Sequence, residues 1–146
     1  MTTSTYEAAG GADGMLALAE AWHRRVLADP VVSHAFSHGF REDHTERLAA
    51  YLGEALGGPR TYTASMGTES EVVRMHSGNG VHEEMDALAL AAWDGALADC
   101  GLDRDVELAR TLHDYFADGI RRMAQHHDTP DTVPDGLALE RWPRPN

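Results

Sequence analysis

The sequence predicts an all-α protein with a single folded domain. Ala, Leu, Glu, Arg and Met dominate the segments between glycine and proline breakers, and these residues favour helices. Apolar residues recur at spacings of three and four in four long stretches, whereas the alternation that marks a half-buried strand is almost absent. The chain has 146 residues, and 42% of them are hydrophobic, which is enough for one sizeable core.

Four long helices are predicted. They cover about Asp13 to Ala28, Glu42 to Leu56, His82 to Asp99 and Asp103 to His126. The first stops at Asp29-Pro30 and the second at Gly57-Gly58-Pro59, because proline cannot continue a helix and glycine permits a left-handed cap. Between these two, a short helical piece over 30–40 is expected to end at Gly39.

The helical pattern breaks over residues 60–80 and again after residue 127. Gly67, Gly78 and Gly80 bracket a short apolar run, which predicts a loop with one or two helical turns. Four prolines after Asp128 predict a tail over 128–146 that is extended or mobile. We place the folded domain at residues 1–127. The tail could still dock on it through three apolar side chains, Leu137, Leu139 and Trp142.

Charge and cysteine content exclude several classes of function. The chain has 24 acidic and 12 basic residues, a formal charge of −12 that would repel nucleic acid and anionic membranes. The first twenty residues do not read as a secretory signal, and no apolar run is long enough to span a bilayer, so we expect a cytoplasmic protein. The single cysteine, Cys100, excludes an internal disulfide and every CxxC pattern for zinc or covalent haem attachment.

Nine histidines make ligand sites possible, and three of them stand out by position. His44 lies four residues before Leu48, on the apolar side of its helix, and His23 lies at the edge of the core face of the first helix. His76 ends a short apolar run. A buried imidazole needs a polar partner or a cofactor, so each could equally be a hydrogen-bonded core residue. Helical spacing alone does not single out haem.

Four segments together resemble the group II truncated haemoglobins in order and spacing. They are Tyr6–Gly11, Val26–Val32, Gly57–Tyr62 and Arg74–His76, and Gly57–Tyr62, which reads GGPRTY, is the most specific. The resemblance covers roughly residues 6–125. It implies a two-over-two helical sandwich that holds haem b without a covalent link.

The resemblance also implies roles for individual residues. His76 matches the proximal iron ligand, and His23 and His44 match the two distal positions. The remaining expected contacts with the cofactor are Phe36, Leu48, Tyr62, Arg74, Met75 and Trp93.

This chain differs from the resembling family on both sides of the expected haem. His23 stands where the family usually has tyrosine, and His44 where it has a small residue. Ala89 takes the place of a tryptophan, and Gly78-Asn79 that of a Pro-Phe pair. Two distal imidazoles that can donate, accept and titrate near neutral pH predict a pocket that handles protons.

These features predict a haem protein that binds O2 or NO and turns over as a nitric oxide dioxygenase or a peroxidase. Either distal histidine could face the iron. A non-catalytic gas carrier or sensor, served by a reductase or signalling partner, is the first alternative, and the protein could be a monomer or homodimer. A haem enzyme that oxidises a small organic substrate would suit a cavity enlarged at Ala89. The last alternative is a non-haem metal site built from His23, His44 and His82.

Overall fold

The structure is a computed structural model that describes residues 3–36 and 42–142. Within these ranges every regular element is helical, which confirms the all-α prediction. The elements in chain order are α1 (Thr5–Ala8), α2 (Gly11–Ala28), η1 (Val32–Phe36), α3 (His44–Ala55), α4 (Thr61–Ser65), α5 (Glu69–Met75), α6 (Glu83–Asp99), η2 (Leu102–Arg104), α7 (Val106–Met123) and η3 (Pro130–Thr132).

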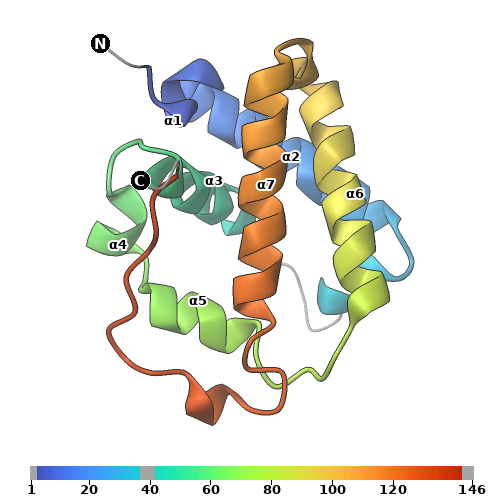
Figure 1. The fold of residues 1–146 in the computed structure, drawn as a ribbon, viewed down its shortest axis with the longest axis vertical. Coiled ribbons are helices and arrows are strands. Elements are labelled where there is room, and N and C mark those ends of the chain that lie inside the picture. Colours follow the sequence, from blue (N-terminus) through green and yellow to red (C-terminus); the bar gives the residue numbers. More distant parts are fainter. Residues whose placement is uncertain (1–2, 37–41, 143–146) are drawn as a thin grey trace.

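The long helices pack as two pairs. Helix α2 packs against α3, α6 lies beside α7, and contacts between α2 and α6 join the pairs (Figure 1). The side chains that fill the space between them are completely shielded from water, and each contributes about 1.5–3 kcal/mol by burial. The largest apolar ones are Trp93, Met15, Leu18, Leu52, Leu56, Leu112 and Val26.

The predicted ends of the long helices differ from the observed ends by three residues at most, as at Val106 and Met123. Helix α7 starts later than predicted because 102–104 form the 3-10 helix η2, and the side chain of Asp105 then accepts the N–H of Leu108 at 3.1 Å. The short helix α1 was not predicted; Ser4 Oγ caps it by accepting the N–H of Glu7. The predicted stop at Gly39 lies outside the described residues.

Two short helices occupy the region that was predicted to be a loop with one or two helical turns. Helix α4 has five residues and α5 has seven, and Met66–Thr68 lie between them. Thr68 Oγ1 caps α5 by accepting the N–H of Glu71 at 3.1 Å. The start of α5 is therefore stabilised by a side-chain cap, although the apolar pattern of the segment is short.

The tail beyond α7 is extended and docked on the body. Apart from η3, its described residues up to Trp142 form no helix, and they pass beneath α5 and return toward α3 (Figure 1). Val133 and Leu139 are buried, and the N–H of Trp142 donates to the carbonyl oxygen of Ala55 at 2.6 Å. The predicted end of the folded domain at residue 127 stays a prediction. No helix in the described ranges is both long enough and apolar enough to cross a membrane.

Candidate functional site

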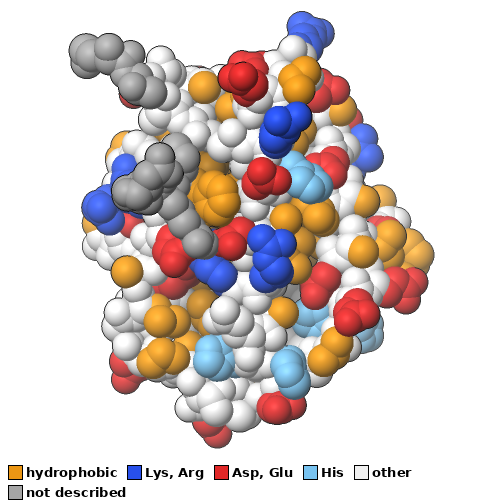
Figure 2. All heavy atoms as spheres, in the orientation of Figure 1, with side chains coloured by type: hydrophobic (Ala, Val, Ile, Leu, Met, Phe, Trp, Pro, Cys, Tyr) orange, Lys and Arg blue, Asp and Glu red, His pale blue; other side chains and the backbone are white. Residues whose placement is uncertain are grey.

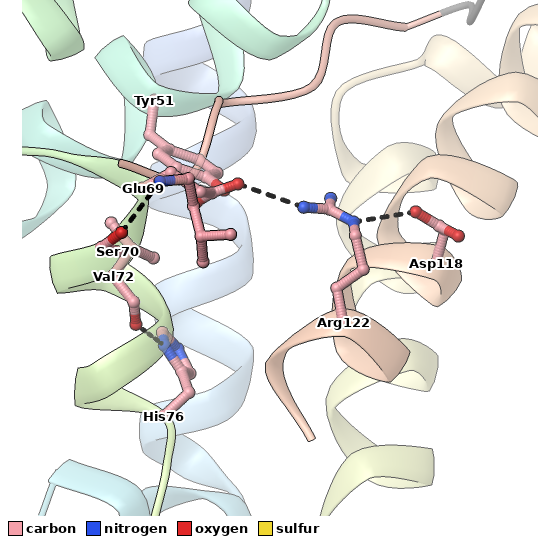
Figure 3. A network of polar contacts seen from close by, with 8 residues as sticks. Tyr51, Glu69, Ser70, Val72, His76, Asp118 and Arg122 are labelled. Atoms are coloured by element: carbon pink, nitrogen blue, oxygen red, sulfur yellow. Dashed lines mark hydrogen bonds and ion pairs between the residues drawn. The ribbon is translucent and has the colours of Figure 1, made fainter. Parts of the chain in front are cut away.

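His76 stands at the end of helix α5, with its side chain turned back along the helix. Nδ1 lies 2.7 Å from the carbonyl oxygen of Val72 (Figure 3). A carbonyl oxygen only accepts hydrogen bonds, so Nδ1 carries a proton, and in the neutral ring the lone pair lies on Nε2. A histidine oriented in this way by a backbone carbonyl is in the form that ligates metals.

The local sequence explains why His76 is presented at the surface. Val72 and Val73 are buried and anchor one face of α5, and Ser77 Oγ donates to the carbonyl oxygen of Val73 at 2.6 Å. His76 is exposed, and the neighbouring Met75 side chain is 67% exposed. An imidazole and a thioether therefore project from the same end of the helix.

A second cluster joins three residues that lie apart in the sequence. His23 comes from α2, Phe36 from the end of η1 and His44 from the start of α3. The ring centroids of His23 and His44 are 4.9 Å apart, and that of Phe36 lies 5.3 Å from His44 and 6.1 Å from His23. The structure thus brings together three of the residues expected around a cofactor.

His23 is held neutral by its surroundings. Its side chain is 3% exposed, and Nδ1 lies 3.0 Å from Thr45 Oγ1. Burial lowers the pKa of His23 from 6.5 to about 4, and the nearby His44 adds to this effect. At pH 7 the His23 ring therefore has one N–H and one lone pair, and the Thr45 hydroxyl can serve either tautomer because it both donates and accepts.

An indole side chain covers the backbone at Ala89, where the family that this chain resembles has a tryptophan. Trp22 Nε1 donates to the carbonyl oxygen of Ala89 at 3.1 Å. The Trp22 ring lies 5.3 Å from His23 and 5.5 Å from Phe116, measured between centroids. Trp22, which projects from α2, therefore packs against α6 and α7, beside the cluster of His23, Phe36 and His44. The sequence indicated only a core aromatic residue at this position.

Trp93 lies in the interface between α6 and α7. It is completely buried, its Nε1 donates to the carbonyl oxygen of Leu112 at 3.0 Å, and its ring stacks on Phe116 with the centroids 4.3 Å apart. These contacts are those of a core aromatic residue.

The other residues expected around a cofactor occupy separate places. Leu48 packs against the core from α3. Tyr62 is buried on α4, its ring 5.3 Å from that of Tyr51. Arg74 on α5 points to the tail, where its guanidinium donates to the carbonyl oxygen of Val133 and pairs with Asp135.

Next to α5 lies a buried polar network that sequence reasoning missed. The hydroxyl of Tyr51 donates to Glu69 Oε1 at 2.7 Å, and Arg122 Nη1 donates to Glu69 Oε2 at 3.2 Å (Figure 3). Arg122 Nε also donates to Asp118 Oδ2 at 2.9 Å. The network ties α5 to α3 and α7. Glu69 and Arg122 are 53 residues apart in sequence, so no local pattern could have paired them.

Burial decides the protonation states in this network. It raises the pKa of Tyr51 well above its ordinary value, with Tyr115 and Glu69 adding to the shift, so Tyr51 stays a hydrogen-bond donor. Burial alone would lower the pKa of Arg122. The hydrogen bond to Asp118 and the neighbouring groups outweigh that effect, and the pKa of Arg122 is raised.

The described residues contain no group of three or more His, Cys, Asp or Glu side chains that could hold a metal ion. His82, which was considered with His23 and His44 for such a site, has its Nδ1 2.8 Å from Asp86 Oδ1 instead. On the face seen in Figure 2, acidic side chains are scattered and basic ones lie between them without forming one patch.

Comparison with known families and structures gives one consistent result. The sequence pattern of the family described as bacterial-like globin matches residues 4–122. Among curated proteins, a group 1 truncated hemoglobin from Tetrahymena pyriformis is 34% identical over 65 residues. That match covers 44% of this chain and 54% of the relative, so the chain spans about half the length of the curated relative it matches.

Several solved structures share the fold. A hemoglobin from Thermobifida fusca is 26% identical with a TM-score of 0.70, covering 92% of this chain and 100% of the other. The group II truncated hemoglobin from Bacillus anthracis is 19% identical with a TM-score of 0.75, covering 88% and 94%. A hemoglobin from Chloroflexus aurantiacus is 24% identical with a TM-score of 0.72, covering 84% and 98%. These likenesses confirm the predicted truncated-globin fold.

Proposed function

The chain belongs to the bacterial-like globin family, and we propose that it holds haem b through His76 and binds a small gas at a distal pocket formed by His23 and His44. Membership of the globins supports haem-based gas binding in general. The ligand assignment, the type of haem and the distal chemistry are specific to this proposal.

The geometry of His76 is the observation that carries the proposal. The Nδ1–H bond to the Val72 carbonyl at 2.7 Å selects the tautomer and fixes the ring, and Nε2 is left as a ligand atom. Among the residues expected to contact the cofactor, Met75 is the last residue of α5 and precedes His76 in the chain, and Phe36 lies against His23 and His44. The residues present therefore suit a haem.

A noncovalent attachment follows from the cysteine content. Covalent haem attachment of the c type uses a CxxCH motif, and this chain has a single cysteine. That residue, Cys100, caps the far end of α6. Retention of haem must therefore rest on the iron ligand and on apolar contacts.

When bound, haem would supply an iron centre able to take up a diatomic gas or a peroxide. His23 is neutral at pH 7, so it can accept a proton from the near oxygen of hydrogen peroxide and return it to the far oxygen. In the other tautomer its N–H can donate to bound dioxygen. The His44 ring lies against that of His23, so His44 can pass the proton on or take the place of His23 as the base. These properties favour oxidative turnover, of the nitric oxide dioxygenase or peroxidase type, over passive carriage.

Haem titration of the apoprotein tests the proximal assignment. We expect His76→Ala to weaken haem binding by more than roughly 100-fold, because loss of residues that merely orient a ligand already costs about 10–100-fold. The control is His113→Ala, which removes a histidine that bonds Asp94 on the surface between α6 and α7. It should bind haem as the wild type does.

A cavity variant separates ligand loss from misfolding. His76→Gly should recover its Soret band when free imidazole is added, because the small molecule can occupy the ligand position. Full haem retention and an unchanged spectrum in His76→Ala would show that another residue binds the iron. Loss of the band in His113→Ala would show that haem binding depends on general stability.

A further inference from the structure

We propose that residues 129–142, hereafter the strap, hold helix α5 and thereby fix the orientation of the His76 imidazole. The inference rests on the proposed role of His76 as iron ligand. The strap lies beyond residues 4–122, which match the globin family, so the family's pattern does not account for it. It passes beneath α5 and returns to α3 (Figure 1).

Helix α5 needs outside support because it is short. It has seven residues, and helices of fewer than about 12 residues are marginal without tertiary contacts. At its first residue, Glu69 is held by Tyr51 and Arg122. Its contacts with other elements are chiefly with η3, which is part of the strap. The support toward the His76 end therefore comes from the tail.

Two side chains of α5 bond the strap directly. Ser70 is 2% exposed; its hydroxyl donates to the carbonyl oxygen of Pro134 at 2.8 Å and accepts the N–H of Leu137 at 3.1 Å. Arg74, one turn further on, donates to the carbonyl oxygen of Val133 at 3.2 Å. Because Ser70 is shielded from water, loss of its hydroxyl would leave strap groups without their partner.

The segment that follows His76 is held to the residues that lead into the strap. The N–H of Gly78 donates to the carbonyl oxygen of His126 at 3.0 Å, and that of Gly80 donates to the carbonyl oxygen of His127 at 2.8 Å. Glycines give a chain more freedom than any other residue, so an unsupported segment here would leave His76 loosely held. The two bonds remove that freedom on the proximal side.

The far end of the strap is anchored to the other side of the molecule. Leu139 is buried, and Trp142 packs on Tyr115 with ring centroids 6.1 Å apart. The N–H of Trp142 donates to the carbonyl oxygen of Ala55, and Arg141 Nη2 donates to that of Gly58 at 3.0 Å. The strap is thus fixed at both ends, and α5 is bonded to its middle.

Two glycines provide a matched pair of variants. Gly78 has φ +77° and Gly80 has φ +74°, so alanine imposes a similar backbone strain at either position. A Cβ at Gly78 would lie 2.9 Å from Pro130 Cδ of the strap, whereas a Cβ at Gly80 meets nothing within 4 Å. Gly78→Ala therefore forces the strap and the segment that follows His76 apart, and Gly80→Ala serves as its control for strain.

Haem-loaded protein should show the difference in two ways. We expect Gly78→Ala to lose haem roughly tenfold faster than Gly80→Ala when an excess of an apoglobin acceptor is added. A tenfold change corresponds to the loss of about one hydrogen bond in a buried site. The iron–imidazole stretching band in the resonance Raman spectrum of the ferrous protein should shift or broaden in Gly78→Ala alone. A strap that only adds global stability would leave that band unchanged.

A serine pair provides an independent check. Ser70→Ala removes the two bonds that Ser70 makes to the strap and leaves those of Arg74, whereas Ser65→Ala removes an exposed hydroxyl that donates to the carbonyl oxygen of Thr61 within α4. Faster haem loss and a changed Raman band in Ser70→Ala, but not in Ser65→Ala, would support the proposal. Equal haem loss rates and identical bands within both pairs would overturn it.

Hydrogen exchange of the apoprotein distinguishes failure of this inference from failure of the haem assignment. Without any haem, Gly78→Ala should still speed amide exchange over residues 70–80 relative to Gly80→Ala if the strap holds α5. If the wild type binds haem through a residue other than His76, exchange would still report on the strap, and the link to the iron ligand would be wrong. Unchanged exchange would show that the strap does not hold α5.

Discussion

His23 is an imidazole that its neighbours keep uncharged. Its ring is packed among Trp22, Phe36 and His44, and Nδ1 lies 3.0 Å from Thr45 Oγ1. The low pKa has a simple cause: a charged ring would lose its hydration and would lie beside a second imidazole. His23 is therefore a base at neutral pH, which suits it to accept a proton from a peroxide.

Replacement of His23 should reduce peroxide turnover. We expect His23→Leu to lower the peroxidase rate by about 10²–10⁴-fold at pH 7, the contribution usual for a general base. In the wild type the rate should fall as the pH decreases through about 4, because the protonated ring no longer accepts a proton. Stopped-flow measurements of both proteins between about pH 3.5 and 8 would test this. The range extends from just below the His23 pKa of about 4 to well above it.

The control for that variant is His34→Leu, which removes an exposed histidine of η1. A carrier or sensor would behave differently from an oxidative enzyme. Reversible oxygen binding without turnover of peroxide or nitric oxide, and an effect of His23→Leu on oxygen dissociation alone, would favour the carrier and contradict the oxidative proposal.

Helix α4 depends on a carboxylate from another helix. Glu54 on α3 is completely buried, yet it has satisfied partners: Oε1 accepts the N–H of Thr63 at 2.9 Å and Oε2 accepts its hydroxyl at 2.6 Å. Thr63 lies in the first turn of α4, where N–H groups lack partners within the helix. Glu54 is therefore a cap supplied from α3, and its burial needs no catalytic explanation.

Removal of this cap should destabilise the fold. We expect Glu54→Ala to lower the free energy of unfolding by about 2–3 kcal/mol, because the N–H and hydroxyl of Thr63 lose a charged acceptor in a shielded site. Urea unfolding followed by circular dichroism would measure the loss. Glu46→Ala, an exposed change on the same helix, should cost less than about 1 kcal/mol. Equal losses in the two variants would contradict the capping role.

Around helix α5, the molecule as a whole is held together by one polar network and one extended segment. Tyr51, Glu69 and Arg122 join α3, α5 and α7 from within, and the strap encloses α5 from outside. Burial of the Glu69 carboxylate, at 4% exposure, is tolerated only because it is paired. The helix that carries His76 is thus connected to both halves of the fold.

Loss of the cation in this network should cost more than any surface change. We expect Arg122→Met to reduce stability by about 3–5 kcal/mol, because Glu69 would remain as an uncompensated buried charge. Arg121→Met removes the neighbouring arginine, whose side chain is 71% exposed, and should change stability by less than about 0.5 kcal/mol.

A double variant tests whether the charge left behind is the cause. Glu69→Gln combined with Arg122→Met should recover part of the loss, because no unpaired carboxylate remains. Thermal or urea unfolding of the wild type, Glu69→Gln, Arg122→Met and the double variant would measure the coupling between the two residues. If the double variant is no more stable than Arg122→Met, the network has another role.

Sequence patterns were sufficient for the features that depend on neighbours along the chain. The long helices, their glycine and proline stops and the turn-like segment over 60–80 follow from local preferences. His44 was predicted to lie on an inward face, and His23 at the edge of one, because a helical repeat places residues four apart on one side. The likeness to the truncated haemoglobins then singled out His76, which spacing could not distinguish from other histidines.

Features that join distant parts of the chain required the folded structure. The pairing of Glu69 with Arg122 spans 53 residues, that of Trp22 with Ala89 spans 67, and Ser70 reaches Leu137 across 67. Each of these residues looks ordinary in its own segment, since a first-turn glutamate or an interfacial tryptophan is common. A hydrogen bond forms only where two groups meet at about 3 Å, and that proximity arises from packing, which local residue preferences do not specify.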